Sequence, residues 1–264
     1  LEHMYFKGTP TRGVGEISKE TKSAGGYLNA GTIYDYTSYY TVLPSSGFVA
    51  GLEIQADAYA NSVIDADELR KELEVIIQEA KRKADNPGAV AIETLYEVLH
   101  DSHRMRRWRI GREEGLRTFT RAHVAGFYRN YYKPRNTILV IVGDVSLREL
   151  VPQLERVFRG WKRGQAPSKQ LSNVSSTQGG KVYLIDKPGA VQSVIVAAHV
   201  TEAGGQPEDL AMEVVMRNFG GMSTSRLNRN LRLDKHWSYG VTGLLEDARG
   251  QRPFMVPPAL RRVT

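Results

Sequence analysis

The sequence predicts an α+β fold made of two domains, and three observations carry this prediction. Residues 27–42 are rich in Tyr and Thr and alternate in polarity, which is typical of paired strands. Residues 65–87 show the helical spacing of apolar side chains between a start signal and a stop signal. Residues 160–180, rich in Gly, Ser and Gln, separate this pattern from a second set of strands and helices. We therefore expect domains at residues 1–159 and 181–264, joined by a linker.

The first domain begins with short elements. Residues 13–26 predict a short helix that Gly25 and Gly26 close. Strands follow within 27–42, most simply as a hairpin. After a turn at 44–47, residues 48–62 have helical spacing.

The longest predicted helix follows. Asp65 is a suitable N-cap, and Glu68 three residues later completes a capping box. The Asn86-Pro87 pair ends the helix. One apolar stripe runs along it, made of Leu69, Leu73, Ile76, Ile77, Ala80 and Ala84.

The remaining elements alternate between the two types. We expect helices at 90–100, 120–132 and 146–161, with a buried strand at 136–145. After the linker we expect strands at 181–189, 191–200 and 238–247 and helices at 207–221 and 224–236. The tail from residue 252 completes no element, so the second domain is expected to be cut short.

The composition excludes several kinds of site. The chain has 264 residues and no cysteine, which excludes disulfides, thiolate nucleophiles and Cys-ligated zinc. A metal must therefore be held by carboxylates and by some of the 6 histidines. Among these, His123 and His199 lie in apolar patterns and are expected to be packed. No apolar run approaches the ~18 residues of a membrane span, which indicates a soluble protein; bacterial periplasm and cytoplasm remain alternatives.

Charge gives a weaker indication. The net charge of +7 permits acidic partners without requiring them. The most basic segment is 103–111, where Trp108 stands between arginines. A nucleic-acid patch has this appearance, but so does a solvated loop, and no RRM, KH or zinc-finger pattern accompanies it. We therefore expect no nucleic-acid partner.

The first three residues carry the most specific chemistry. Two histidines four apart on a helix can face one zinc ion, with a glutamate between them as the general base. In the inverted H-x-x-E-H order this glutamate precedes the second histidine. Glu2 and His3 fit the last two positions. The first histidine would lie two residues before Leu1, so we expect this chain by itself to hold zinc poorly and to be inactive.

A third ligand is needed, and the long helix offers two carboxylates. Glu72 and Glu79 are seven residues apart, which places them about 20° apart around the helix axis. They lie on the flank of the apolar stripe, where a charge needs a partner if it is buried. A solvated helix flank is the alternative.

Five segments, in this order, resemble the M16 (pitrilysin/insulinase) metallopeptidase family. They are LEHMYFKGT, SAGGYLNAGTIYDYTSYY, ELEVIIQEAKRKADNP, FYRNYYKPRNTILVIVGDV and SRLNRNLRLDKHWSYG, which together extend over nearly the whole chain. The resemblance implies two LuxS/metallohydrolase-like α+β domains, each a mostly antiparallel sheet covered by helices. It also implies that the first domain is truncated at its start and the second at its end.

The resemblance further implies roles for individual residues. Glu2 would be the general base, His3 and Glu79 zinc ligands, and Glu72 a carboxylate that supports the site. A bound peptide would add as a strand beside Asn29 and Ala30. Arg232 and Tyr239 match the Arg/Tyr pair that approaches the substrate carbonyl, where a cation and a phenol can stabilise an oxyanion. The alternative for this pair is ordinary ion pairing and packing.

The implied function is a zinc metalloendopeptidase acting on peptides or unfolded segments, with Zn²⁺ as cofactor. Its partner would be a second M16 half, or a homodimer mate that receives Arg232 and Tyr239 across the interface. The alternative from another class is a non-catalytic family member that binds peptides or acts as a scaffold. The presence of Glu2, His3, Glu72 and Glu79 together favours the enzyme.

Overall fold

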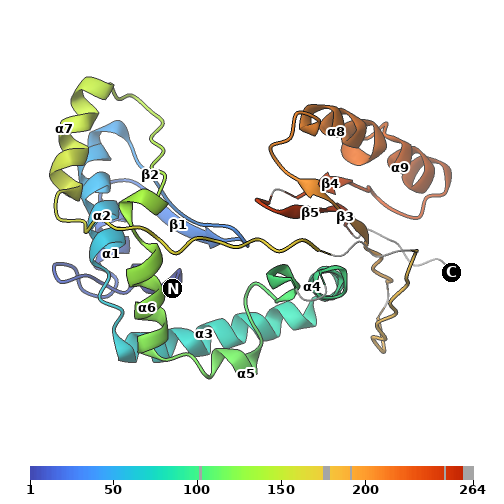
Figure 1. Cartoon of the computed structure of the whole chain (residues 1–264), viewed down its shortest axis with the longest axis horizontal. Helices are drawn as coiled ribbons and strands as arrows, with labels where there is room; N and C mark the ends of the chain where they lie inside the picture. Colours follow the sequence, from blue (N-terminus) through green and yellow to red (C-terminus); the bar gives the residue numbers. More distant parts are fainter. Residues whose placement is uncertain (101–102, 175–178, 191, 247, 258–264) are drawn as a thin grey trace. The chain divides into compact units, whose positions relative to one another are not determined.

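A computed structural model describes residues 1–100, 103–174, 179–190, 192–246 and 248–257 (Figure 1). The chain forms two compact units. The first contains Leu1–Gln78 and Arg112–Lys169, and the second contains Glu79–Gly111 and Gln170–Thr264. The passage from residue 169 to 170 lies inside the predicted linker, whereas residues 79–111 group with the second unit. The domain limits taken from the sequence stay a prediction.

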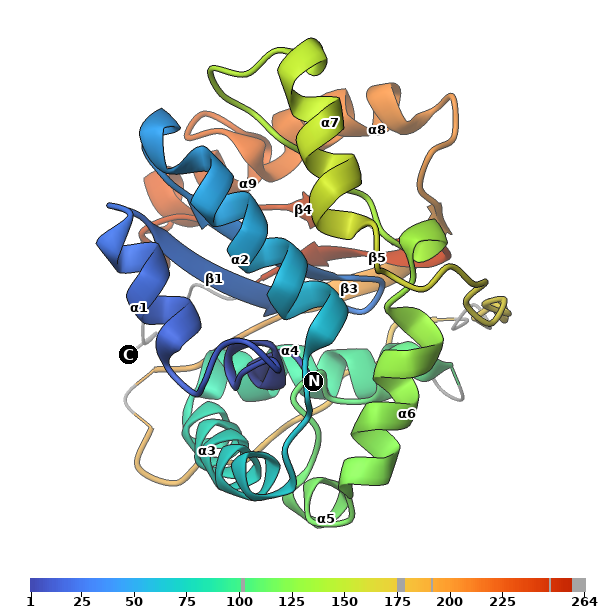
Figure 2. The same ribbon diagram turned by 90° about the vertical axis from the view of Figure 1, so that its left-hand side faces the viewer.

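The first unit is built around a hairpin and the helices that cover it. Strands β1 (Tyr27–Thr32) and β2 (Thr37–Val42) pair antiparallel. The backbone of Gly26 lies so close to the end of β2 that a Cβ at this position would be 2.3 Å from the Val42 carbonyl oxygen, so only glycine fits there. Figure 2 shows α2 (Phe48–Asn61) lying across this hairpin, beside α1 (Glu16–Ser23).

The other elements of the first unit extend this arrangement. They are η1 (His3–Phe6), η2 (Ser45–Gly47), most of α3 (Ala66–Asp85), α5 (Glu113–Leu116), α6 (Arg121–Tyr131), η4 (Pro134–Asn136) and α7 (Leu147–Phe158). Helix α7 packs against α2. One hydrophobic cluster joins Tyr5 to Ile17, Ile54 and Ala58, and a second joins Met4 to Ile64, Leu69, Val124 and Ala125. Both clusters start from η1, which therefore lies at the centre of this unit's packing.

The second unit contains a three-stranded antiparallel sheet in the order β3-β5-β4. Its elements are the end of α3, α4 (Pro87–Leu99), η3 (Arg104–Arg106), β3 (Ala197–Ala203), α8 (Asp209–Met216), η5 (Arg217–Gly221), α9 (Arg226–Asn228), η6 (Arg229–Asp234), β4 (Leu244–Leu245) and β5 (Gln251–Val256). Helix α4 contacts β3, and α8 contacts β4. The expected α+β class with antiparallel sheets is confirmed.

Four predicted strands are wrong or too long. Residues 136–145 and 181–189 form no strand, and most of their apolar side chains are exposed, with Val142 at 92% and Val182 at 96%. The predicted strand at 191–200 begins only at Ala197, and that at 238–247 contracts to Leu244–Leu245. A strand forms only where a neighbour completes its hydrogen-bond ladder, and among the described residues these segments have no such neighbour. Residues 175–178, 191, 247 and 258–264 of the predicted linker, strands and tail lie outside the described residues.

The helices agree better with the sequence. Asp65 caps α3 by accepting from the amides of Asp67 and Glu68, each at 2.9 Å. The Glu68 side chain turns instead to Lys71, at 2.6 Å. Helix α4 begins at Pro87, three residues earlier than expected, because the Asn86 side chain accepts from the Ala89 amide. No helix in the described part of the chain is long and apolar enough to cross a membrane.

Candidate functional site

The Glu2-His3 pair lies on a turn that two buried neighbours hold in place. Met4 is 1% exposed and Tyr5 is 3% exposed, and each belongs to one of the two hydrophobic clusters of the first unit. The Met4 carbonyl oxygen also accepts from the Ser62 hydroxyl at 3.2 Å. Because residues 4 and 5 point into the packing, Glu2 and His3 are left half-buried at its margin.

Glu72 of α3 orients the His3 ring. Its Oε2 lies 2.8 Å from His3 Nδ1, and its Oε1 lies 2.5 Å from Lys7 Nζ. Burial by itself would raise the pKa of Glu72, but the hydrogen bonds from Lys7 and His3 outweigh burial and lower it. The carboxylate is therefore ionised at neutral pH, so Nδ1 carries the proton that it donates.

This arrangement fits a metal ligand. Histidines that bind metals usually donate the N–H of one ring nitrogen to a carboxylate and bind with the other nitrogen. For His3 that other nitrogen is Nε2. The structure thus brings His3 and Glu72 together, and the supporting role of Glu72 at a metal site stays a prediction.

Glu2 is held by a residue that the sequence reasoning missed. Thr32 Oγ1, at the end of β1, donates a short hydrogen bond to Glu2 Oε2, and lies 3.1 Å from Thr37 Oγ1 across the hairpin. Nearby, the hydroxyl groups of Tyr39 and Tyr132 are hydrogen-bonded to each other at 2.7 Å. Burial raises the pKa of Tyr132 to about 12, and the nearby Glu2 charge adds to this. Glu2 thus lies beside aromatic rings at the end of a strand.

Asn29 and Ala30 lie on that same strand. The Asn29 side-chain oxygen accepts from the Ala30 amide at 2.9 Å. Within the described residues the β1 ladder pairs only with β2, so the other edge of β1 has the geometry to accept an extended peptide.

Glu79 lies on α3, seven residues beyond Glu72, and is half-buried. Seven residues correspond to about 10 Å along the helix, with both side chains on nearly the same face. Glu79 belongs to the second unit, so its role as third ligand stays a prediction. Among the described residues, no group of three His, Asp or Glu side chains is positioned to hold a metal ion.

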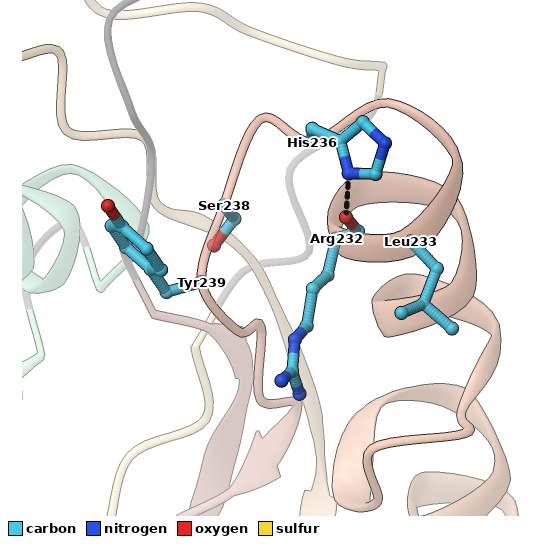
Figure 3. A pocket seen from close by; sticks show the side chains of 5 residues that line it. All are labelled: Arg232, Leu233, His236, Ser238 and Tyr239. Carbon is cyan, nitrogen blue, oxygen red and sulfur yellow. Dashed lines mark hydrogen bonds between the residues drawn. The ribbon is translucent and has the colours of Figure 1, made fainter.

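Arg232 and Tyr239 belong to the second unit and line one cavity of about 350 Å³ (Figure 3). Leu233, His236 and Ser238 complete its lining. Figure 3 shows the Arg232 guanidinium and the Tyr239 phenol pointing in different directions, and Tyr239 is 83% exposed. His236 adopts a left-handed backbone (φ 56°) and its Nδ1 lies 3.0 Å from the Arg232 carbonyl oxygen, which closes the turn between the pair.

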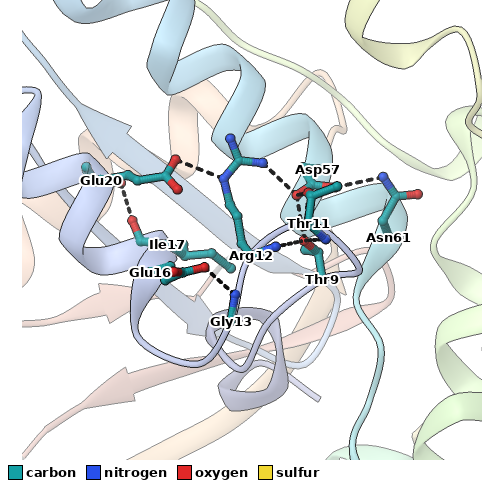
Figure 4. Close-up of polar contacts among 10 residues, drawn as sticks. Thr9, Thr11, Arg12, Gly13, Glu16, Ile17, Glu20, Asp57 and Asn61 are labelled. Atoms are coloured by element: carbon teal, nitrogen blue, oxygen red, sulfur yellow. Dashed lines mark hydrogen bonds and ion pairs between the residues drawn. The ribbon is translucent and has the colours of Figure 1, made fainter.

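A polar network fixes the loop after the Glu2-His3 turn (Figure 4). Asp57 of α2 accepts from the Thr9 hydroxyl at 2.6 Å, the Thr11 hydroxyl at 2.8 Å and Arg12 Nη1 at 2.7 Å. Burial would raise the pKa of Asp57, but these bonds and one from Asn61 outweigh it and lower the pKa. Thr9, Thr11 and Arg12 all lie in the TxTR stretch that directly follows LEHMYFKG. This cluster of polar residues was the sequence signal that could have indicated the network.

The other histidines behave differently from expectation. His123 and His199 are exposed rather than packed. His123 lies in the first turn of α6, where its side chain forms a capping box with Thr120. His100 and His103 are the buried ones, at 0% and 5% exposure.

The chain matches two family models. The model described as "Insulinase (Peptidase family M16)" matches residues 1–110, and the model described as "Peptidase M16 inactive domain" matches residues 118–256. An "uncharacterized zinc protease" of Rickettsia bellii is 31% identical over 245 residues. One of Bacillus subtilis is 27% identical over 242 residues. In both cases the match covers 91% of this chain and 58% of the relative, so the chain spans little more than half their length.

Solved structures agree in fold. A protease from Helicobacter pylori superposes with a TM-score of 0.91 at 21% identity, covering 99% of this chain and 64% of that one. The periplasmic protease PqqL of Escherichia coli gives a TM-score of 0.75 at 19% identity, with 98% and 30% covered. Because one family model alone covers more than half of the chain, the chain belongs to the M16, or insulinase, family of peptidases.

Proposed function

We propose that this chain is part of a zinc metalloendopeptidase that hydrolyses peptides or unfolded polypeptide segments. The observation that carries the proposal is the hydrogen bond between Glu72 and Nδ1 of His3, one residue after Glu2. A carboxylate behind a histidine is how proteins prepare that ring for a metal ion. The relatives from Rickettsia and Bacillus carry the name zinc protease, which supports the choice of metal.

Under this proposal, His3 and Glu79 hold the ion together with a histidine two residues before Leu1. A bound Zn²⁺ would polarise the scissile carbonyl and make water a better nucleophile near neutral pH. Glu2 takes the proton from the attacking water and delivers it to the leaving amine. The hydrogen bond from Thr32 fixes the carboxylate that performs both transfers.

Substrate binding would use the open edge of β1. Backbone groups near Asn29 and Ala30 accept an extended peptide as an added strand, which favours unfolded substrates. Arg232 and Tyr239 approach the substrate carbonyl, where a cation and a phenol lower the energy of the developing oxyanion. Since the chain spans 58% of its first relatives, we propose a second M16 half or a homodimer mate as partner.

The proposal is tested in the intact protein, which carries the histidine expected before Leu1, by cleavage of an unfolded reporter polypeptide together with zinc content. Glu2→Gln is expected to keep the zinc of the wild type and to lose turnover by several orders of magnitude, because the proton acceptor is gone. The matched control is Glu74→Gln, since Glu74 is an exposed glutamate of α3 that pairs with Arg117. Retained turnover in Glu2→Gln would remove Glu2 as the base.

A second candidate is a non-catalytic subunit that binds peptides or acts as a scaffold. The matched model described as an inactive domain, which covers residues 118–256, favours it. Peptide binding through β1 without turnover, in a protein that carries its zinc, would support this alternative.

A further inference from the structure

Lys7 closes the Glu2-His3 turn, and its side chain reaches the same carboxylate as His3. It follows η1 directly, and its backbone N–H bonds to the Met4 carbonyl oxygen at 3.2 Å. His3 and Lys7 are four apart, and both contact Glu72, which lies 65 residues beyond Lys7 in the sequence.

The two oxygens of Glu72 have different partners. Oε1 is 2.5 Å from Lys7 Nζ, and Oε2 is 2.8 Å from His3 Nδ1. The side chain of Glu72 is 11% exposed, against 23% for Lys7 and 27% for His3. An ion pair that is this sheltered from water holds its geometry better than an exposed pair does.

Lys7 is committed to Glu72 rather than shared evenly. The other carboxylate near it, Glu68, has its Oε2 4.0 Å from Lys7 Nζ. Glu68 has its own lysine, since its Oε1 lies 2.6 Å from Lys71 Nζ. The two lysines and the two glutamates therefore form two pairs, of which only the Lys7 pair touches the histidine.

We propose that Lys7 is a positioning residue for the metal ligand His3. By holding Oε1, the ammonium group aims Oε2 at Nδ1, which keeps His3 in the tautomer whose Nε2 can bind a divalent cation. With both oxygens of Glu72 engaged, that glutamate supports the site instead of entering it, and the ligand role passes to Glu79. The part of this inference that concerns zinc binding rests on the proposed function. The part that concerns the tautomer of the His3 ring does not.

Removal of the charge has a predictable consequence. Without Lys7, a nearly buried carboxylate oxygen loses its partner, and the side chain gains by turning toward water or by protonation. Either change loosens the hold on Nδ1. Loss of such an outer partner typically lowers metal affinity by about 10- to 100-fold.

In the intact protein, which carries the histidine expected before Leu1, the experiment compares Lys7→Met with Lys7→Arg and a control, Lys71→Met. Methionine keeps the length of lysine without its charge, arginine restores a cation, and Lys71 is 65% exposed in a pair that does not touch His3. The first readout is the tautomer of His3 in the metal-free protein, from its ring ¹⁵N shifts. The second is the dissociation constant for Zn²⁺, measured against a competing chelator.

In the wild type and in Lys71→Met we expect the Nδ1–H tautomer. In Lys7→Met we expect a mixture of tautomers and zinc affinity lowered by about 10-fold or more, both largely restored in Lys7→Arg. If Lys7→Met does not fold, Lys7→Gln replaces it, because glutamine is a neutral hydrogen-bond donor. Its tautomer ratio and zinc affinity should then lie between those of the wild type and those expected for Lys7→Met. An Nδ1–H tautomer and a zinc affinity in Lys7→Met, or in Lys7→Gln where Lys7→Met does not fold, equal to those of Lys71→Met would overturn the proposal. A wild type that binds no zinc would defeat the proposed function alone, and the tautomer would still decide the role of Lys7.

Discussion

Replacing Asp57 with asparagine should loosen the loop that follows the Glu2-His3 turn. The Asp57 carboxylate accepts four hydrogen bonds, three at Oδ2 from Thr9, Thr11 and Arg12 and one at Oδ1 from Asn61. In asparagine, the amide nitrogen that replaces one carboxylate oxygen does not accept hydrogen bonds, so a neutral donor such as Asn61 loses its partner. The remaining oxygen carries no negative charge, so the bond from Arg12 loses its ionic partner. One neutral bond and one bond to a charged group together contribute about 2 to 4 kcal/mol.

Hydrogen exchange of the loop amides measures this loss. The amides of Thr11 and Arg12 bond to Thr9 Oγ1 at 3.2 Å and 3.0 Å, so they report on the loop directly. Since about 1.4 kcal/mol corresponds to a factor of ten, Asp57→Asn should exchange them roughly 30-fold faster or more. The control is Asp67→Asn, whose 72%-exposed side chain pairs with Arg70 at the surface. Exchange in Asp57→Asn no faster than in this control would refute the reasoning.

The same carboxylate predicts a dependence on pH. The folded pKa of Asp57 lies below its ordinary value of 3.8. The stabilisation that the Asp57 carboxylate gives the folded state is therefore fully present above pH 3.8. It is lost as pH falls from there through the folded pKa, since the unfolded chain binds the proton first. Protection of the loop amides should fall in acid in the wild type, and this fall should be smaller in Asp57→Asn.

Three further predictions concern other parts of the chain. Thr32→Val keeps the shape but removes the donor to Glu2; turnover should fall about tenfold, as expected for about 1.4 kcal/mol, with zinc content unchanged, whereas equal turnover would leave Thr32 without a role in the reaction. Lys83→Met leaves Glu93, which is 2% exposed, without its ion-pair partner; urea unfolding should show a loss of about 3 to 5 kcal/mol, against almost none for the exposed Lys71→Met. Burial lowers the pKa of His100 to about 4, so the unfolded chain binds a proton that the folded chain does not, and stability should fall between about pH 6.5 and 4; His100→Gln should flatten that slope, and an unchanged slope would contradict it.

The helices could be predicted from the sequence because their signals are local. The Asp65 cap and the Asn86-Pro87 stop each act within three residues, and both ends of α3 agree with them. The strands expected at 136–145 and 181–189 failed for the opposite reason. Their apolar pattern is genuine, but pairing depends on a partner elsewhere in the chain, which no local pattern reveals.

The candidate site divides along the same line. The dipeptide Glu2-His3 could be found because the chemistry of an H-x-x-E-H motif is written in consecutive residues. Thr32 and Glu72 reach these residues across 30 and 69 positions of sequence, so their contacts appear only in the fold. The contact of Lys7 with Glu72 spans 65 positions of sequence, so it too appears only in the fold.

The most direct test of the central claim is the zinc content of the protein with His3 intact and replaced. In the intact protein, which carries the histidine expected two residues before Leu1, we expect about one bound zinc ion per active half at neutral pH, and loss of most of it in His3→Ala and in Glu79→Gln. Glu74→Gln, on the same helix, should keep the full amount. Zinc that stays bound in His3→Ala, or an intact wild type that takes up none, would contradict the proposed zinc site with His3 as a ligand.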